Sequence, residues 1–410
     1  MLFLWLARSL SLEDYATFGL LYALQTGLMT LAIAGIMEAV VGLLKEHRLP
    51  EQREKLFSAA NTAFALMLLP AILFALFVFL TFGEPLGSLS DALVYVLIVG
   101  SLGAYSSLQA QIVRLEEKHI ASLWFNFIAP LSGLIGGFFS FFIERTVPSF
   151  FLGSAVGTLV SLLGFWINRI GFYGVANRIS ETRLIFIGVV PFIGIGFLGW
   201  LSGYGNNFLI KIFFESADVA KFTFAFMLSS IMQLVATAMN QVWSPRFYKI
   251  VHELSFEQVE KRNRQFFRLQ AVVMGLVGAF VIALFPSTIS MLGGNLIAYK
   301  SLSLELLLLF SAYILLSPWW HCQNYYLAHG KGSRLLKIVL ITSAMGITVS
   351  LILMWIVGPI GIYLGFLAQM LFRSLGVLVA AKNYWPVKIS WGGIGAGVLI
   401  TFLGFLVSTN

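Results

Sequence analysis

Long apolar runs separated by short polar stretches dominate the chain, and they predict a bundle of membrane-spanning helices. A span needs about 20 apolar residues, because the hydrocarbon core is about 30 Å thick and an α-helix rises about 1.5 Å per residue. Runs of spanning length fall at 15–44, 57–82, 91–113, 120–143, 148–168, 184–213, 219–243, 266–292, 299–328, 334–357, 359–381 and 390–408. We therefore predict an all-α polytopic membrane protein with about twelve complete transmembrane helices and an N-terminal partial helix, MLFLWLA.

The first spanning run begins with a helix start signal. Ser11 and Asp14 have the spacing of a capping box, and Glu13 and Asp14 place negative charge where the helix dipole favours it. Between Asp14 and Lys45 the one ionisable acid or amine is Glu38. The run is about 45 Å long as a helix, so we expect it to be tilted or to project beyond the bilayer.

Lysine and arginine alternate from one connection to the next, which predicts the orientation. Twenty of the 26 basic residues lie in one set of alternate connections, five lie in the other, and Arg373 lies inside a run. Basic loops stay in the cytoplasm. This places the first set inside and the C-terminus outside. The five external basic residues are Arg8, Arg145, Lys211, Lys221 and Lys300.

Composition agrees with this class. The chain is 59% hydrophobic and 11% charged, whereas soluble domains carry about 25% charged residues. The net charge of +8 follows the membrane topology and does not indicate a nucleic-acid partner. The single cysteine, Cys322, excludes an internal disulfide, and no further Cys or His accompanies the adjacent His321 and Cys322 to complete a metal site.

The start of the chain carries a motif: an arginine, an S-x-E-D-Y turn and a long helix containing glycine. The residues are Arg8, Ser11, Glu13, Asp14, Tyr15 and Gly19. This pattern resembles the start of polysaccharide-export flippases, the O-antigen (Wzx-type) flippases among them, in the multidrug/oligosaccharidyl-lipid/polysaccharide exporter superfamily. These have a full first helix, so the resemblance implies that the chain begins within that helix. A similar acidic start, aromatic first turn and basic exit recur at 215–249.

The resemblance implies two parallel, pseudo-symmetric bundles around a central cavity. We expect an N-terminal bundle at 1–170, a cytoplasmic linker at 171–183 and a C-terminal bundle at 184–410. The implied function is flipping a polyprenyl-diphosphate-linked oligosaccharide of the undecaprenyl type across the inner (cytoplasmic) membrane for surface polysaccharide such as lipopolysaccharide O-antigen. The implied partners are this lipid-linked oligosaccharide, membrane lipids and polysaccharide polymerase machinery. No cofactor is implied beyond coupling to H⁺ or Na⁺.

Polar groups inside the spans are candidate cavity residues, because a charge within the bilayer is costly. Arg373 lies more than two turns from Lys382, and Gln369 lies one turn away on the same face. One interpretation is a cation that meets an anionic headgroup in the cavity. The alternative is an arginine that extends to the interface.

Four weaker candidates complete the predicted site. Three roles are open for Glu38: binding a coupling cation, pairing with a cavity arginine, or a position at the interface. Lys211 and Asn207 lie near the outer end of the seventh helix. Flippases of this kind often carry an acidic residue there. This chain has Asn206 and Asn207 instead, which argues against a proton or sodium site. Arg8 either faces the cavity or marks the interface.

Glycine, proline and aromatic residues give further expectations. The interrupted run 184–213 predicts a bent or broken helix. The pairs Gly133/Gly137 and Gly199/Gly203 have the spacing of close helix contacts. For the aromatic residues of the stretch 317–330 we favour a role in helix packing over stacking against sugar rings. The basic loop 244–268 forms either an interfacial helix or a plain linker.

Two other function classes remain to be weighed. A multidrug-type, cation-coupled antiporter should carry a membrane-embedded acidic cluster, and here Glu38 is the one candidate. A membrane glycosyltransferase or polymerase needs a sizeable extramembrane catalytic segment, and the external loops are too short for one. The sequence therefore favours a transporter over an enzyme.

Overall fold

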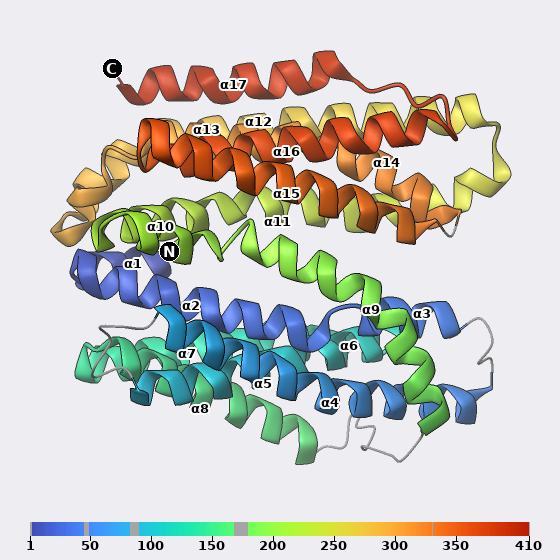
Figure 1. Cartoon of the computed structure of the whole chain (residues 1–410), viewed down its shortest axis with the longest axis horizontal. Coiled ribbons are helices and arrows are strands. Elements are labelled where there is room, and N and C mark those ends of the chain that lie inside the picture. The colour runs from blue at the N-terminus through green and yellow to red at the C-terminus, as the bar shows by residue number, and fades with distance from the viewer. Residues whose placement is uncertain (1, 45–48, 83–89, 168–178, 330, 410) are drawn as a thin grey trace. The chain divides into compact units, whose positions relative to one another are not determined.

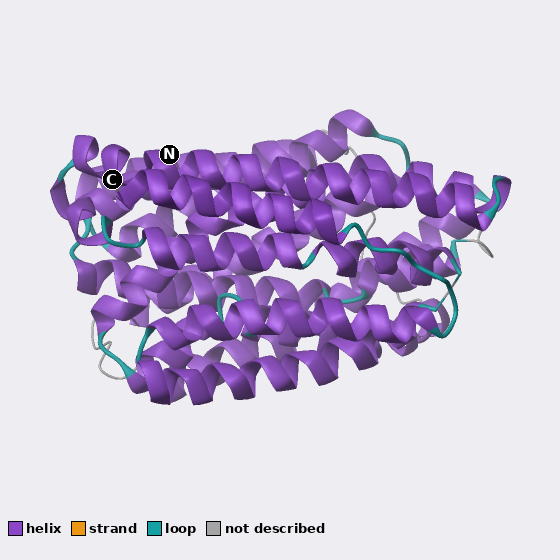
Figure 2. Ribbon diagram, turned by 90° about the horizontal axis from the view of Figure 1, so that it is seen from above, coloured by secondary structure: helices purple, strands orange, loops and turns teal. Residues whose placement is uncertain are grey.

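The computed structural model describes residues 2–44, 49–82, 90–167, 179–329 and 331–409. The described residues are helices joined by short connections, with no strand among them (Figure 2). Eleven helices are long and apolar enough to cross a membrane, and a bent pair at Ser180–Leu201 makes up to twelve spans. The all-α, multi-pass prediction is confirmed.

Contacts group the chain into two compact units. The N-terminal unit comprises Thr17–Ile212. The C-terminal unit comprises Phe213–Asn410 together with Phe3–Ala16. Most of the predicted linker at 171–183 lies outside the described residues, so that boundary stays a prediction.

The N-terminal unit is built mainly from pairs of helices that follow each other directly, or nearly so, along the chain. Its helices α7 and α8 pack against each other, α5 packs on α8, and α9 packs on α3 and α4 (Figure 1). Its elements are α2 (Leu12–Ile33) from Thr17 onward, α3 (Ile36–Leu43), α4 (Pro50–Phe82), α5 (Ser90–Leu115), α6 (His119–Leu123), the π-helical turn η1 (Trp124–Ile128), α7 (Ala129–Glu144), α8 (Val147–Ile167), α9 (Ile179–Leu201) and α10 (Asn206–Phe213) as far as Ile212.

The C-terminal unit pairs α12 with α17 and α15 with α16, and α13 packs against both α16 and α17 (Figure 1). Its elements are α1 (Leu2–Ser9), α11 (Ser216–Glu253), α12 (Phe256–Leu292), the 3₁₀ turn η2 (Gly294–Tyr299), α13 (Ser303–Leu315), α14 (Ser317–Ala328), α15 (Gly332–Val357), α16 (Ile360–Lys382) and α17 (Trp391–Thr409).

Two spans are interrupted, and the sequence predicted one of the interruptions. The run 184–213 bends by 46° between Val190 and Phe192, and helix α9 ends at Leu201 before α10 begins. The first run was expected to be one long helix, and this is wrong: it breaks at Gly35, whose φ of +71° suits glycine. A side chain there is also excluded, because its Cβ would lie 2.5 Å from Cβ of Phe192.

Glycines allow the closest helix contacts. A Cβ on Gly133 would lie 2.3 Å from Oγ1 of Thr158, and one on Gly137 would lie 2.3 Å from Oγ of Ser154, so this predicted contact between α7 and α8 is confirmed. The second predicted pair is wrong. Among the described residues, no atom outside the local helix backbone lies within 4 Å of a Cβ built on Gly199, and the partner glycine lies beyond the end of α9.

The stretch 244–268 is neither a separate interfacial helix nor a linker. Helix α11 continues through Pro245 to Glu253, and α12 begins at Phe256. Both helices have at least 37 residues. That is about 55 Å, well beyond the hydrocarbon core. The basic residues predicted to be cytoplasmic therefore lie on a helical hairpin that extends past the span.

Candidate functional site

The predicted start motif, as far as Tyr15, packs within the C-terminal unit. The Ser11 hydroxyl accepts the Asp14 backbone N–H (3.1 Å) and donates to the Asp14 carboxylate (2.7 Å), which confirms the helix cap. Tyr15, fully buried, packs edge-on against Tyr299 and beside Phe224. Burial raises the pKa of the Tyr299 hydroxyl. This part of the motif therefore anchors the start of α2 to η2 and α11.

Arg373 lies within α16, nine residues before Lys382 and thus about 14 Å from that end of the helix. Its Nη2 donates to the hydroxyl of Ser343 on α15 (3.0 Å). Its Nε is buried and has no hydrogen-bond partner in the part of the chain that the structure describes. Among the described residues, no carboxylate lies within 4.0 Å of the guanidinium. Arg373 is therefore a part-buried cation without an acidic partner.

Gln369 shares the same hydroxyl, as its position one turn before Arg373 predicted. Its Nε2 donates to Oγ of Ser343 at 3.3 Å, and both residues are buried. The two helices approach closely here, because a Cβ on Gly346 would lie 2.4 Å from Cβ of Gln369. This glycine contact between α15 and α16 fixes the hydroxyl and the amide beside the guanidinium.

An aromatic ring completes the group. The centroid of the Trp319 ring, on α14, lies 5.7 Å from Cζ of Arg373. This distance is within the range of a cation–π interaction, which attracts a guanidinium to an indole face. We call Arg373, Gln369, Ser343 and Trp319 the Arg373 cluster.

The Arg373 cluster has the chemistry of an anion site. An unpaired charge within a membrane is expensive, so such groups face a cavity, water or a partner. A guanidinium can hold a phosphate or carboxylate through two parallel N–H···O bonds. Among the described residues Nε has no acceptor, and Nη2 bonds a neutral hydroxyl.

The other predicted residues lie elsewhere. Arg8 is exposed at the end of α1, and its Cγ lies against Gly294 of η2. Asn207 is fully buried on α10, and its amide lies 3.5 Å from the carbonyl of Gly19. Lys211 lies one turn later on α10 and is half-buried. The side chain of Glu38, on α3, lies outside the described residues.

Sequence reasoning missed a buried contact between a carboxylate and an imidazole in the C-terminal unit. Glu260 on α12 and His321 on α14 are both buried, and Nε2 of His321 lies 3.2 Å from each carboxylate oxygen. Glu260 stands in the polar stretch VEKRNR, which is typical of an exposed surface. Helical spacing carried the missing signal: Glu260, Asn263 and Phe267 recur at i, i+3 and i+7 and form one buried face.

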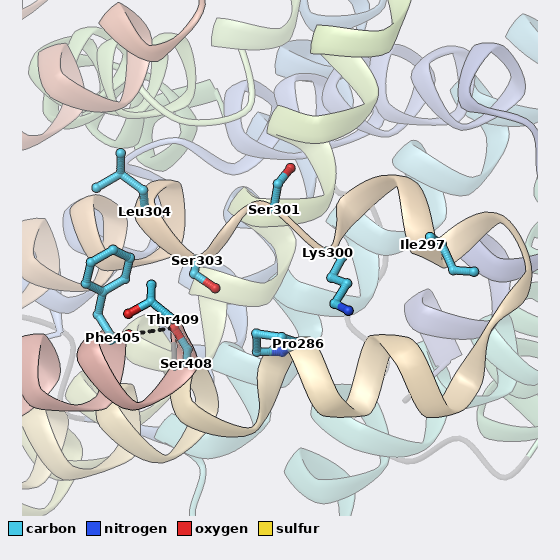
Figure 3. Close-up of a pocket in the computed structure, with 9 residues that line it drawn as sticks. All are labelled: Pro286, Ile297, Lys300, Ser301, Ser303, Leu304, Phe405, Ser408 and Thr409. Atoms are coloured by element: carbon cyan, nitrogen blue, oxygen red, sulfur yellow. Dashed lines mark hydrogen bonds between the residues drawn. The ribbon is translucent and has the colours of Figure 1, made fainter.

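A separate pocket of about 510 Å³ opens between α12, α13 and α17. Lys300 is its one charged lining residue, and hydroxyls of Ser303, Ser408 and Thr409 accompany it (Figure 3). Pro286 forms part of its wall. None of the predicted site residues lines this pocket, so the pocket is distinct from the Arg373 cluster.

Solved structures of membrane transporters share the fold. An inward-facing multidrug resistance MATE family transporter of the MOP superfamily has a TM-score of 0.67 at 15% identity and covers 92% of this chain and 94% of its own. The lipid II flippase MurJ in an inward closed conformation has a TM-score of 0.62 at 14% identity, covering 100% and 95%. VcmN, a MATE transporter of Vibrio cholerae in its bent form, has a TM-score of 0.55 at 15% identity, covering 94% and 88%.

The helices thus define a multi-pass membrane protein with the fold of these MOP superfamily structures. A family model described as polysaccharide biosynthesis protein matches residues 2–251, more than half of the chain. The chain belongs to this polysaccharide biosynthesis protein family. A search of curated proteins finds no match.

Proposed function

We propose that this protein flips a polyprenyl-diphosphate-linked oligosaccharide from the cytoplasmic to the outer leaflet of the inner membrane. The observation that carries the proposal is the part-buried guanidinium of Arg373, which has no carboxylate partner among the described residues. Family membership supports a substrate from polysaccharide assembly. The MurJ structure, described as a lipid II flippase, shows that a protein of this fold handles a lipid-linked substrate.

The diphosphate is the part of such a substrate that needs a protein cation. A headgroup with negative charge cannot cross hydrocarbon unless fixed donors replace its water. Arg373 supplies two N–H groups in a fork, and Gln369 with Ser343 can turn their polar atoms toward the same anion. Trp319 lies beside the guanidinium, partly buried against the hydrophobic cluster of the same unit. We assign the diphosphate to Arg373.

The experiment is complementation of a strain that lacks its own polysaccharide flippase. Arg373→Ala should lower surface glycan by at least about tenfold, because each lost charge-assisted hydrogen bond contributes about 1.5–3 kcal/mol. Arg373→Lys keeps the charge, loses the fork and should retain partial activity. Lys382→Ala is the matched control, since Lys382 is exposed at the end of the same helix. Normal glycan with Arg373→Ala at a normal membrane level would contradict the proposal.

A multidrug-type antiporter is the second candidate, and the similarity to MATE structures favours it. The two functions differ in the sign of the cargo: a diphosphate suits Arg373, whereas an organic cation does not. Vesicles that contain the purified protein distinguish them. Arg373-dependent movement of a fluorescent polyprenyl diphosphate supports the flippase, and transport of an organic cation that Arg373→Ala leaves unchanged supports the antiporter.

A further inference from the structure

The pocket of about 510 Å³ in the C-terminal unit lies at the ends of three candidate membrane spans. Its lining residues come from the last two turns of α12, which ends at Leu292, from the connection 297–301, from the start of α13 at Ser303 and from the end of α17 at Thr409. A pocket at the ends of spans lies at the depth where hydrocarbon meets the lipid headgroups. The alternation of basic residues predicts that this is the outer side, because Lys300 is one of the five external cations.

The cation of this pocket is held by a rigid stretch of backbone. Tyr299 and Leu302, on either side of Lys300 and Ser301, are buried, and the Tyr299 ring stacks on Phe224 at 4.4 Å. The Lys300 side chain itself is exposed. Among the described residues, no carboxylate lines the pocket and none lies within 4.0 Å of the Lys300 ammonium. The pocket therefore presents a fixed cation that no acid neutralises.

The end of α17 presents hydrogen-bond acceptors to the same pocket. The Ser408 hydroxyl donates to the carbonyl of Phe405 at 2.7 Å, and the Thr409 hydroxyl donates to the carbonyl of Leu406 at 3.0 Å. A hydroxyl has one hydrogen to donate, so these two oxygens are left to accept. Figure 3 shows them apart from the Lys300 ammonium, with the ring of Phe405 beside them.

We propose that this pocket binds the headgroup of an anionic phospholipid of the phosphatidylglycerol type from the leaflet that it faces. The phosphate pairs with Lys300, and the glycerol hydroxyls of the headgroup donate to Ser408 and Thr409. Leu304 and Phe405 supply the apolar wall along which the lipid leaves the pocket toward the bilayer. The proposal is independent of the substrate assigned to Arg373.

The charge and the donor pattern select this lipid among the phosphates that a membrane offers. Phosphatidylglycerol carries one negative charge, which the single cation of the pocket neutralises. A choline headgroup has no N–H or O–H to donate to the two acceptor oxygens. A lipid diphosphate brings a second negative charge without a second cation to meet it. Free phosphate leaves the apolar wall of the pocket uncovered.

Native mass spectrometry of the purified full-length protein in detergent tests the site without any transport measurement. The protein is titrated with phosphatidylglycerol, phosphatidylmethanol and phosphatidylcholine of identical acyl chains. Phosphatidylmethanol has the same single charge but no headgroup hydroxyl. The first phosphatidylglycerol should bind about threefold more tightly than the first phosphatidylmethanol, because neutral hydrogen bonds contribute modestly. Lys300→Met keeps the apolar stem, loses the charge and should weaken both anionic lipids about fivefold, as for an exposed ion pair.

A second variant separates the hydroxyls from the cation. Ser408→Ala combined with Thr409→Val should abolish the preference for phosphatidylglycerol over phosphatidylmethanol and keep the preference of both over phosphatidylcholine. Thr81→Val is its matched control, since Thr81 also bonds a carbonyl of its own helix near a helix end. Arg145→Asn is the control for Lys300→Met: it removes an exposed cation, and asparagine tolerates the φ of +54° found there. Both controls should keep the original titrations.

Four results would overturn the proposal. The first is a phosphatidylglycerol titration that Lys300→Met changes no more than Arg145→Asn does. The second is equal binding of phosphatidylglycerol and phosphatidylmethanol to the unsubstituted protein. The third is displacement of the lipid by millimolar inorganic phosphate, which would assign the pocket to a free anion. The fourth is displacement by a short-chain polyprenyl diphosphate at lower concentration than phosphatidylglycerol, which would assign the pocket to the transported lipid.

Discussion

The seam between α12 and α17 offers a test in which one helix supplies both the perturbation and its control. A Cβ on Gly397 would lie 2.4 Å from the carbonyl oxygen of Ala271 and 3.0 Å from its carbon. Both atoms are backbone, so the contact can be relieved only by moving a helix. A Cβ on Gly395, two residues earlier in α17, meets nothing within 4 Å.

These distances set the expected magnitude. Forcing a methyl group into a closely packed interface costs about 1–3 kcal/mol. Alanine also has a higher helix propensity than glycine, by up to about 1 kcal/mol. Gly397→Ala should therefore be destabilised on balance. Gly395→Ala has the second effect alone and should be neutral or slightly more stable.

The chain contains its own reporter for this comparison. Cys322 is the one cysteine in the sequence and is fully buried, so a thiol-reactive fluorescent dye labels it only as the fold opens. Thermal ramps of the purified variants in detergent should show Gly397→Ala opening a few degrees earlier than the unsubstituted protein. Equal transition temperatures for the two glycine variants would refute the backbone-contact reasoning.

Three further predictions concern topology and buried polar groups. In a Cys322→Ser background, an impermeant thiol reagent should label a cysteine at Ser301 from outside and not one at Ser255; the reverse pattern would invert the orientation. Tyr299→Phe removes a buried hydroxyl that has no hydrogen-bond partner among the described residues, and should raise the transition temperature slightly; a lower transition temperature would reveal a partner. Asn207→Asp replaces an amide donor with an acceptor beside a backbone carbonyl and should lower stability by about 1–3 kcal/mol, as thermal ramps would show.

The spans could be predicted from sequence because their signal is local. Each apolar run has to cover the same hydrocarbon thickness, and each boundary carries charged or turn residues. The break at Gly35 was not predicted, because what requires it is a neighbour distant in sequence, Phe192. The contact at Gly199 was predicted wrongly for the same reason: spacing permits a close approach but does not supply a partner helix.

The candidate site divides in the same way. Gln369 was found with Arg373 because the two are one turn apart on one helix. Ser343 and Trp319 were not found, since they come from α15 and α14, and only tertiary packing brings them to the guanidinium. Glu260 was missed because its basic neighbours in sequence are typical of an exposed surface. Its side chain is nevertheless buried, in contact with His321 on α14.

Helix α14 joins the two chemical features of the C-terminal unit. Trp319, which lies against Arg373, and His321, which lies against Glu260, are two residues apart and so point to different sides of this helix. A rotation or shift of α14 cannot keep both contacts unchanged. A ligand that displaced Trp319 from Arg373 would therefore also disturb the contact between His321 and Glu260. A shared element whose position depends on both contacts is the physical requirement for coupling between two sites.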